Sequence, residues 1–212
     1  MKIEALLLDL DGTLIDSTRD IAESVRHIQN HFGVALSSDK DVASYIGDGI
    51  GMLVSRALPA FSPEQHTVAV ELLKRYYTQH CLEHTLIYPG VVETLRTLNP
   101  IKMAVVTNKP ERVSRRILKG LKLDEYISVV VGGDTLPEKK PNPAPLHHAL
   151  LQLGHQNLES TLMVGDSNVD VEAGRAAGLK TVGILSTIGD QSALRASGPD
   201  YLLTSFSELT HL

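Results

Sequence analysis

The feature that most constrains this chain is a short apolar stretch that ends in two acids, Leu6-Leu7-Leu8-Asp9-Leu10-Asp11-Gly12-Thr13. An apolar run of this length predicts a fully buried strand of a parallel sheet. Ligands of open α/β sheets bind beyond the carboxyl ends of such strands, which is where Asp9 and Asp11 stand. Side chains two residues apart in a strand lie on the same side, so we expect the two carboxylates to meet in one small site. Gly12 lets the backbone turn closely around a ligand, which suits phosphate chemistry.

The Asp11-Gly12 pair has a second interpretation, because Asp-Gly between apolar residues is also a hairpin-turn signal. The residues that follow argue against a hairpin. Apolar side chains recur there at helical rather than strand spacing, at Ile21, Ala22, Val25, Ile28 and Phe32. We therefore expect a strand followed by a helix.

Length and composition limit the class of protein. A chain of 212 residues is long enough for one large domain or for a core with an inserted subdomain. With 42% hydrophobic and 21% charged residues, the composition is that of an ordinary soluble globular protein. A net charge of -5 provides no basic surface for nucleic acid or for an anionic membrane, so we expect small-molecule partners. No apolar run approaches the ~20 residues that a membrane span requires.

The cysteine content and the amino terminus bear on the compartment. Cys81 is the only cysteine, which excludes an intrachain disulfide and fits a reducing compartment. The first residues lead directly into a strand and lack the pattern of a signal peptide. We expect a cytoplasmic protein that is a monomer or a homodimer.

The chain contains two kinds of segment. All periodic segments between residues 15 and 87 are helical, whereas apolar strands and helices alternate from residue 88 onward. This alternation predicts an α/β fold, with a parallel sheet covered by helices on both faces. In the helical stretch, His27 and His31 have the spacing of a metal-binding pair, but no third ligand is evident and we expect a solvated face.

The longest helix of the helical stretch is expected to begin at Pro63. Its buried stripe is predicted from apolar residues at helical spacing, namely Val68, Leu72, Leu73 and Tyr76. The neighbouring residues expected on the surface are Tyr77, His80 and His84.

A glycine cluster, Gly47-Asp48-Gly49-Ile50-Gly51, interrupts the helical stretch. It is not a dinucleotide-binding fingerprint, because it does not follow a strand and lacks the required spacing. Two interpretations remain open. The cluster is either a tight loop between helices or a mobile loop that senses the substrate, with Arg56 nearby to meet an anionic group.

Polar residues recur at the expected carboxyl ends of the later strands. Thr107 and Asn108 follow one strand, Lys140 stands just before a helix, and Asp166 follows another strand with Asp170 one turn further on. Each alone has an ordinary structural explanation, such as a helix cap, a surface lysine, a turn or an acid favoured by the helix dipole. Together with Asp9 and Asp11, and in this order, they form a specific pattern.

This set of motifs, DxDGT, a strand-terminal Thr, KPNP and GDSxxD, resembles the haloacid dehalogenase-like phosphohydrolase superfamily over essentially the whole chain. The resemblance implies a Rossmann-like core, formed by residues 1–14 and 88–212, and an inserted helical cap at residues 15–87 that closes over the site. Three segments look most like the phosphoglycolate phosphatase branch: the Gly47-Asp48-Gly49 loop followed by Arg56, Tyr88-Pro89-Gly90, and Lys139-Lys140-Pro141-Asn142-Pro143.

The chemistry expected of these residues matches the roles in the superfamily. Asp9 is the candidate nucleophile, which would form an aspartyl-phosphate. Asp11 is the candidate acid and base, which would protonate the leaving oxygen and then activate water. Thr107 would hold phosphate oxygens and Lys140 would offset their charge. The other residues expected to bind phosphate or the rest of the substrate are Gly12, Asn108, Gly47, Asp48, Gly49 and Arg56.

Clustered carboxylates repel each other and the substrate, so the site requires a cation, and Mg²⁺ prefers oxygen ligands. The resemblance implies that Asp9, the backbone carbonyl of Asp11 and Asp166 bind Mg²⁺, with Asp170 in a supporting position.

We therefore expect a Mg²⁺-dependent phosphatase acting on a small phosphomonoester, with 2-phosphoglycolate as the leading candidate. An acid at position 11 favours phosphoryl transfer over the dehalogenase and phosphonatase reactions of the same superfamily. A pyrophosphatase and a β-phosphoglucomutase-like transferase remain as alternatives within the enzyme class. A phospho-receiver signalling domain and a catalytically silent binding protein are the alternatives from other classes.

Overall fold

The structure is a computed structural model that describes residues 2–186 and 189–212. Its centre is a six-stranded sheet in which all neighbouring strands are parallel, in the order β5-β4-β1-β6-β7-β8. The strands are β1 (Ala5–Leu8), β4 (Lys102–Val106), β5 (Val129–Val131), β6 (Thr161–Gly165), β7 (Lys180–Ile184) and β8 (Tyr201–Leu203). The predicted α/β class is confirmed.

The register of the central strands brings the predicted motifs to one edge of the sheet. Leu8, the last residue of β1, lies opposite Val105 of β4 and Val164 of β6. Asp9, Thr107 and Asp166 follow these residues within two positions, so all three leave the sheet at the same edge.

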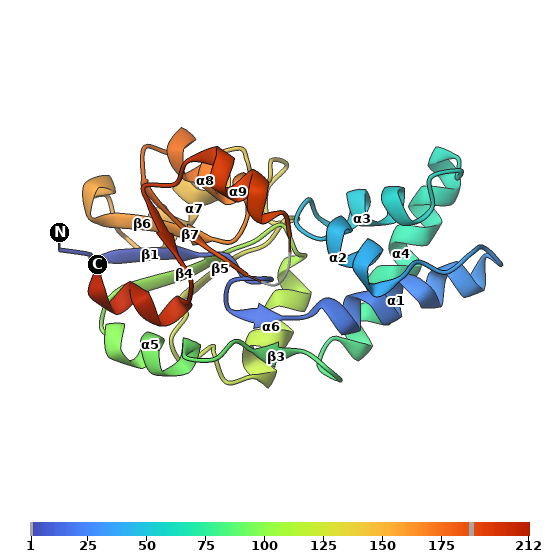
Figure 1. Ribbon diagram of the computed structural model, residues 1–212, viewed down its shortest axis with the longest axis horizontal. Helices are drawn as coiled ribbons and strands as arrows, with labels where there is room; N and C mark the ends of the chain where they lie inside the picture. The colour runs from blue at the N-terminus through green and yellow to red at the C-terminus, as the bar shows by residue number, and fades with distance from the viewer. Residues whose placement is uncertain (1, 187–188) are drawn as a thin grey trace.

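Helices cover both faces of the sheet (Figure 1). One face carries α5 (Val91–Leu98), α6 (Glu111–Gly120) and the carboxyl-terminal 3-10 helix η2 (Phe206–His211). The other carries α7 (Ala144–Gln152), α8 (Asn168–Ala176) and α9 (Gln191–Ser197). Leu6 and Leu8 belong to one hydrophobic cluster and Leu7 belongs to the other, because alternate side chains of β1 point to opposite faces. This burial on both faces explains the uninterrupted apolar run.

The helical stretch lies at one end of the molecule (Figure 1). It consists of α1 (Thr18–His31), α2 (Asp39–Tyr45), α3 (Ile50–Ala57) and α4 (Pro63–His80). A two-stranded antiparallel ribbon of β2 (Ile15–Asp16) and β3 (Leu86–Ile87) joins it to the sheet, a pairing that the sequence pattern did not predict. The division into a core and a cap at residues 14/15 and 87/88 stays a prediction.

The buried face of α4 differs from the prediction. The structure buries Ala69, Leu73 and Tyr77, whereas Val68 is 53% exposed. These three residues are spaced by four and form one inward-facing row along the helix, so the prediction was right for Leu73 and wrong for Val68. The expectation that Tyr77 lies on the surface was wrong, and this residue lines the cavity described below.

The two histidines of α1 make aromatic contacts. His27 stacks on Tyr76 of α4 with ring centroids 3.8 Å apart, and His31 packs edge-on against Phe32 at 4.8 Å. Cys81 is buried. Within residues 2–186 and 189–212, no helix combines the length and apolarity needed to cross a membrane.

Candidate active site

Three acids from two strand ends meet at the carboxyl edge of the sheet. One oxygen each from Asp9, Asp166 and Asp170 lies within 4.8 Å of the others, and all three residues are buried. Asp9 follows β1, Asp166 follows β6, and Asp170 stands in the first turn of α8. The Asp170 side chain also accepts hydrogen bonds from the Ser167 backbone and hydroxyl, which closes a capping box and fixes its position.

Lys140 provides a positive charge to this cluster. Its ammonium group donates to Asp9 Oδ1 at 2.8 Å and to Asp170 Oδ1 at 2.6 Å, and its side chain is almost fully buried. Burial alone would lower the pKa of this ammonium, but the carboxylates of Asp170 and Asp9 raise it above its ordinary value. Lys140 is therefore a fixed cation beside the candidate nucleophile.

Two acids of the cluster, Asp9 and Asp166, are difficult to keep ionised without a further cation. Burial raises the pKa of Asp9 to about 6; Lys140 opposes this shift, and the Asp170 and Asp11 carboxylates add to it. Burial likewise raises the pKa of Asp166 well above its ordinary value, with the Asp9 charge as the next cause. Crowded carboxylates in a poorly solvated site are the expected environment of a metal-binding cluster.

Gly12 leaves the space that Asp166 occupies. A Cβ atom on Gly12 would lie 2.0 Å from Asp166 Oδ2, and the Gly12 backbone has a φ of +83°. The Asp166 carboxylate is held by the hydroxyls of Ser186, at 2.9 Å, and of Thr13, at 3.4 Å. A glycine is therefore required at position 12 for both its backbone conformation and its lack of a side chain.

Asp11 lies in the same cavity but has different partners. Lys109 Nζ donates to both of its carboxylate oxygens at 2.7 Å, and Ser17 Oγ donates to Oδ1 at 2.5 Å. The Lys109 ammonium also lies 4.8 Å from the centre of the Tyr77 ring. Burial alone would lower the pKa of Lys109, but Asp11 raises it above its ordinary value. Each acid of the first motif thus has its own buried lysine.

Sequence reasoning missed Lys109, Tyr77 and Ser17. Lys109 directly follows Thr107 and Asn108 at the end of β4, so its position among polar residues at a strand end was an available signal. For Tyr77 and Ser17 the signal was weak, because a tyrosine on an amphipathic helix and a serine before one are common structural residues.

The remaining predicted residues of the core occupy the same region. Thr107 is buried, and its hydroxyl oxygen accepts a hydrogen bond from the Lys109 backbone at 3.2 Å. Asn108 Nδ2 donates to the carbonyl oxygens of Gly47, at 2.9 Å, and of Lys140, at 3.1 Å. Asn108 therefore links the glycine loop of the helical stretch to the segment that carries Lys140.

The glycine loop contacts the core through its backbone. The Lys139 ammonium donates to the Asp48 carbonyl oxygen, and Gly49 packs against the Asn108 carbonyl, 3.1 Å from the position of an added Cβ. Arg56 pairs with the Asp48 carboxylate at 2.5 Å and donates to the Tyr45 carbonyl at 3.2 Å. Its guanidinium thus braces the loop, and substrate binding by Arg56 stays a prediction.

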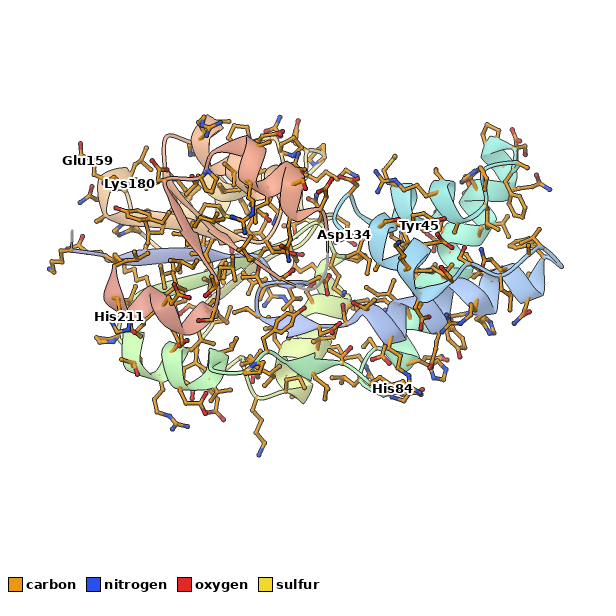
Figure 2. All side chains as sticks on the ribbon, viewed as in Figure 1. Tyr45, His84, Asp134, Glu159, Lys180 and His211 are labelled. Atoms are coloured by element: carbon orange, nitrogen blue, oxygen red, sulfur yellow. The ribbon has the colours of Figure 1, made fainter. Side chains whose placement is uncertain are left out.

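A cavity of about 80 Å³ joins these residues. Its polar part contains Asp9, Asp11 and Asp166, together with Lys109. Its other side is formed by apolar residues of the helical stretch and by Tyr45, which Figure 2 labels in that part of the molecule. The small volume suits a compact ligand.

The donor set fits a divalent metal ion. Three buried carboxylates present oxygen atoms within 4.8 Å of one another, which is the ligand type that Mg²⁺ prefers. The four acids Asp9, Asp11, Asp166 and Asp170 outnumber the two lysines that touch them, so a divalent cation would restore the charge balance.

Fold and site together define an α/β protein with a cluster of buried acids, suited to hold a metal ion, at the carboxyl edge of a parallel sheet. The sequence profile of the haloacid dehalogenase-like hydrolases matches residues 6–184. The chain belongs to this family.

Relatives with known names are similar over almost their full length. The chain is 38% identical to the phosphoglycolate phosphatase of Chromobacterium violaceum, covering 99% of this chain and 96% of that protein. It is 37% identical to the phosphoglycolate phosphatase of Aquifex aeolicus, with the same coverage. A crystal structure from Haemophilus somnus, described as a predicted phosphoglycolate phosphatase, superposes with a TM-score of 0.93 at 29% identity, covering 100% of this chain and 98% of that one.

Proposed function

We propose that this protein is a Mg²⁺-dependent phosphatase that hydrolyses a small phosphomonoester, with 2-phosphoglycolate as the first candidate. The observation that carries the proposal is the position of Asp9, in a cluster of buried acids and on the wall of a cavity that Asp11 and Asp166 also line. The names of the similar proteins support the substrate, because both curated relatives described above are phosphoglycolate phosphatases.

Asp9, Asp166 and the backbone carbonyl of Asp11 would hold Mg²⁺, with Asp170 in support. When bound, Mg²⁺ supplies positive charge that offsets the carboxylates and polarises the phosphoryl group. Lys140 adds a second positive charge beside Asp9, which favours the ionised form of this carboxylate and offsets the charge of the phosphate.

In the first half of the reaction, an Asp9 carboxylate oxygen attacks phosphorus and forms an acyl phosphate, while the bond from phosphorus to the ester oxygen breaks. Asp11 gives its proton to that departing oxygen, so the leaving group is a neutral alcohol. Ser17 and Lys109 contact the Asp11 side chain and hold it on the cavity wall, and the proton transfer turns its carboxylic acid into the carboxylate that acts as base in the second half.

In the second half, Asp11 takes a proton from water as the water oxygen attacks phosphorus. The bond from phosphorus to the Asp9 oxygen breaks, which releases inorganic phosphate and restores the Asp9 carboxylate. The Thr107 hydroxyl is proposed to hold a phosphate oxygen in both halves, with backbone amides near Gly12 and Asn108. The same two acids therefore serve the whole cycle.

The proposal extends to the setting of the enzyme. Its partner is a small phosphorylated metabolite. A cytoplasmic location, inferred from the single cysteine, stays a prediction, and so does the monomeric or homodimeric state.

The test is phosphate release with Mg²⁺ from 2-phosphoglycolate, pyrophosphate, sugar phosphates and an aryl phosphate, for the wild-type protein and for Asp9→Asn. We expect a preference for 2-phosphoglycolate and a loss of roughly 10³-fold or more in the variant. Asp124→Asn, which changes an exposed acid after α6, is the matched control and should keep full activity. Substantial turnover by Asp9→Asn would reject the covalent role of Asp9.

The substrate panel also separates the alternatives. A preference for pyrophosphate or for sugar phosphates would leave the roles of Asp9 and Asp11 in place and change only the substrate. No release from any compound, by folded protein with Mg²⁺ present, would favour a catalytically silent binding protein.

A further inference from the structure

Tyr77 of α4 carries a buried hydroxyl without a hydrogen-bond partner among the residues that the structure describes. The residue is 4% exposed and lines the cavity that holds Asp9 and Asp11. Burial raises the pKa of this phenol well above its ordinary value, so the group is a neutral O–H donor. An unsatisfied buried donor is rare in proteins because it loses its hydrogen bond to water. A ligand acceptor in the cavity would satisfy it.

Lys109 lies over the Tyr77 ring and carries a positive charge. Its ammonium group lies 4.8 Å from the Tyr77 ring centre and makes two hydrogen bonds, both to Asp11. An ammonium has three N–H donors, so the two bonds to Asp11 leave one that Asp11 does not use. Lys109 is also the only lysine or arginine among the described residues that line this cavity. The pair thus combines a charged donor and a neutral donor.

Tyr77 and Lys109 lie on the side of the cavity where the leaving group of the substrate is expected. Asp11 is proposed to protonate the leaving oxygen, so the groups that touch Asp11 surround the leaving-group side of the cavity. In 2-phosphoglycolate the carboxylate is attached to the carbon that bears the leaving oxygen. A group that recognises this carboxylate must therefore lie close to Asp11, as Lys109 does. Arg56 is bound to Asp48 and Tyr45 and is not among the residues of the cavity wall.

We propose that the Tyr77 hydroxyl and the Lys109 ammonium form a carboxylate-binding subsite that selects short phosphomonoesters with an anionic group beside the ester oxygen. This inference rests on the proposed function and adds the residues that determine its specificity. The surrounding wall, which includes Ile21, Leu53 and Leu73, is apolar and strengthens each hydrogen bond to a bound anion.

The test compares 2-phosphoglycolate with ethyl phosphate, in which a methyl group replaces the carboxylate. Both have alkyl leaving groups that require protonation, so any effect that acts only through Asp11 changes both substrates equally. Tyr77→Phe removes only the hydroxyl, and the absence of a partner predicts that the variant folds normally. Tyr76→Phe makes the same change one residue earlier, at a side chain stacked between His27 and His80.

We expect Tyr77→Phe to lower kcat/KM for 2-phosphoglycolate by about 10- to 100-fold, mainly through KM, and to leave ethyl phosphate unchanged. Tyr76→Phe should alter neither value. Lys109→Met should also lower the ratio of the two kcat/KM values, although it weakens both substrates because Asp11 loses its partner. Thermal melting of each variant checks the fold.

Each other outcome overturns the inference. Equal losses on both substrates in Tyr77→Phe would show that the residue acts only through Asp11, and no loss on either would show that its hydroxyl binds nothing. If the wild-type enzyme hydrolyses other esters but does not favour 2-phosphoglycolate, the proposed carboxylate subsite is refuted and the phosphatase function is retained. A wild-type protein that hydrolyses nothing would refute the proposed function itself, which distinguishes the two failures.

Discussion

Gly12→Ala is the substitution that most directly tests the geometry of the acidic cluster. The new Cβ atom would lie 2.0 Å from Asp166 Oδ2 and 2.5 Å from Asp166 Cγ, much closer than any non-bonded contact allows. Asp166 must then rotate away, because the neighbouring atoms of position 12 are backbone in a tight turn. The substitution therefore changes the acidic cluster without removing any of its carboxylates.

The expected cost has two parts. Forcing alanine into a backbone with φ of +83° costs about 1–2 kcal/mol. Displacing Asp166 breaks its hydrogen bond with the Ser186 hydroxyl, now 2.9 Å long, which costs about 1–3 kcal/mol in a buried site. Together we expect the free energy of unfolding to fall by about 2–5 kcal/mol.

Gly33→Ala is the matched control. Gly33 follows α1 with a φ of +66°, and an added Cβ there would meet no atom within 4 Å. This variant carries the backbone strain without the collision. Urea denaturation followed by circular dichroism measures both variants, and calorimetric titration with Mg²⁺ measures metal binding. We expect Gly33→Ala to bind Mg²⁺ like the wild-type protein and Gly12→Ala to bind it at least tenfold more weakly.

Two results would refute this reasoning. Equal losses of stability in the two variants would show that the collision with Asp166 is relieved at no cost. Unchanged Mg²⁺ affinity in Gly12→Ala would show that the position of Asp166 does not matter for the metal.

Two further predictions concern stability. Asp20→Asn should lower the free energy of unfolding, measured by urea denaturation, by about 2–4 kcal/mol. The buried Asp20 carboxylate accepts hydrogen bonds from two backbone N–H groups and from the Thr85 hydroxyl. The control Glu23→Gln should change this free energy by less than about 1 kcal/mol. Partial burial would raise the pKa of Asp200, but hydrogen bonds from Thr181 lower it. Its ionised form thus stabilises the fold above the unfolded pKa. Because the side chain is exposed and solvent screens its interactions, Asp200→Asn should cost less than about 1 kcal/mol at neutral pH. The urea midpoints of the two proteins should converge below about pH 4, and a constant difference would contradict this.

Much of the site follows from local sequence patterns. The apolar run before Asp9 identifies a buried strand, and polar residues directly after such a run must lie at the edge of the sheet. Lys140 and Asp170 are placed by the helices that begin beside them. These signals are local, because strand length, helix caps and apolar spacing are properties of neighbouring residues.

The partners of these residues are set by the tertiary structure. Lys109 and Asp11 are far apart in the chain, and they pair because β4 lies beside β1. Whether Tyr76 or Tyr77 faces inward depends on how α4 is rotated against α1. The apolar spacing along α4 does not determine this rotation to within one residue. Arg56 lies near the glycine loop in the sequence, yet its side chain is committed to Asp48.

The sequence by itself determined the fold class and the acids of the cluster, because burial and chain direction impose them residue by residue, and its motifs indicated the family by resemblance. Only the tertiary structure decided which lysine pairs with which acid and which tyrosine lines the cavity. Those choices depend on strand order and helix packing. A contact between two segments that are far apart in the chain does not change the spacing of apolar residues in either segment, so the sequence pattern does not reveal it.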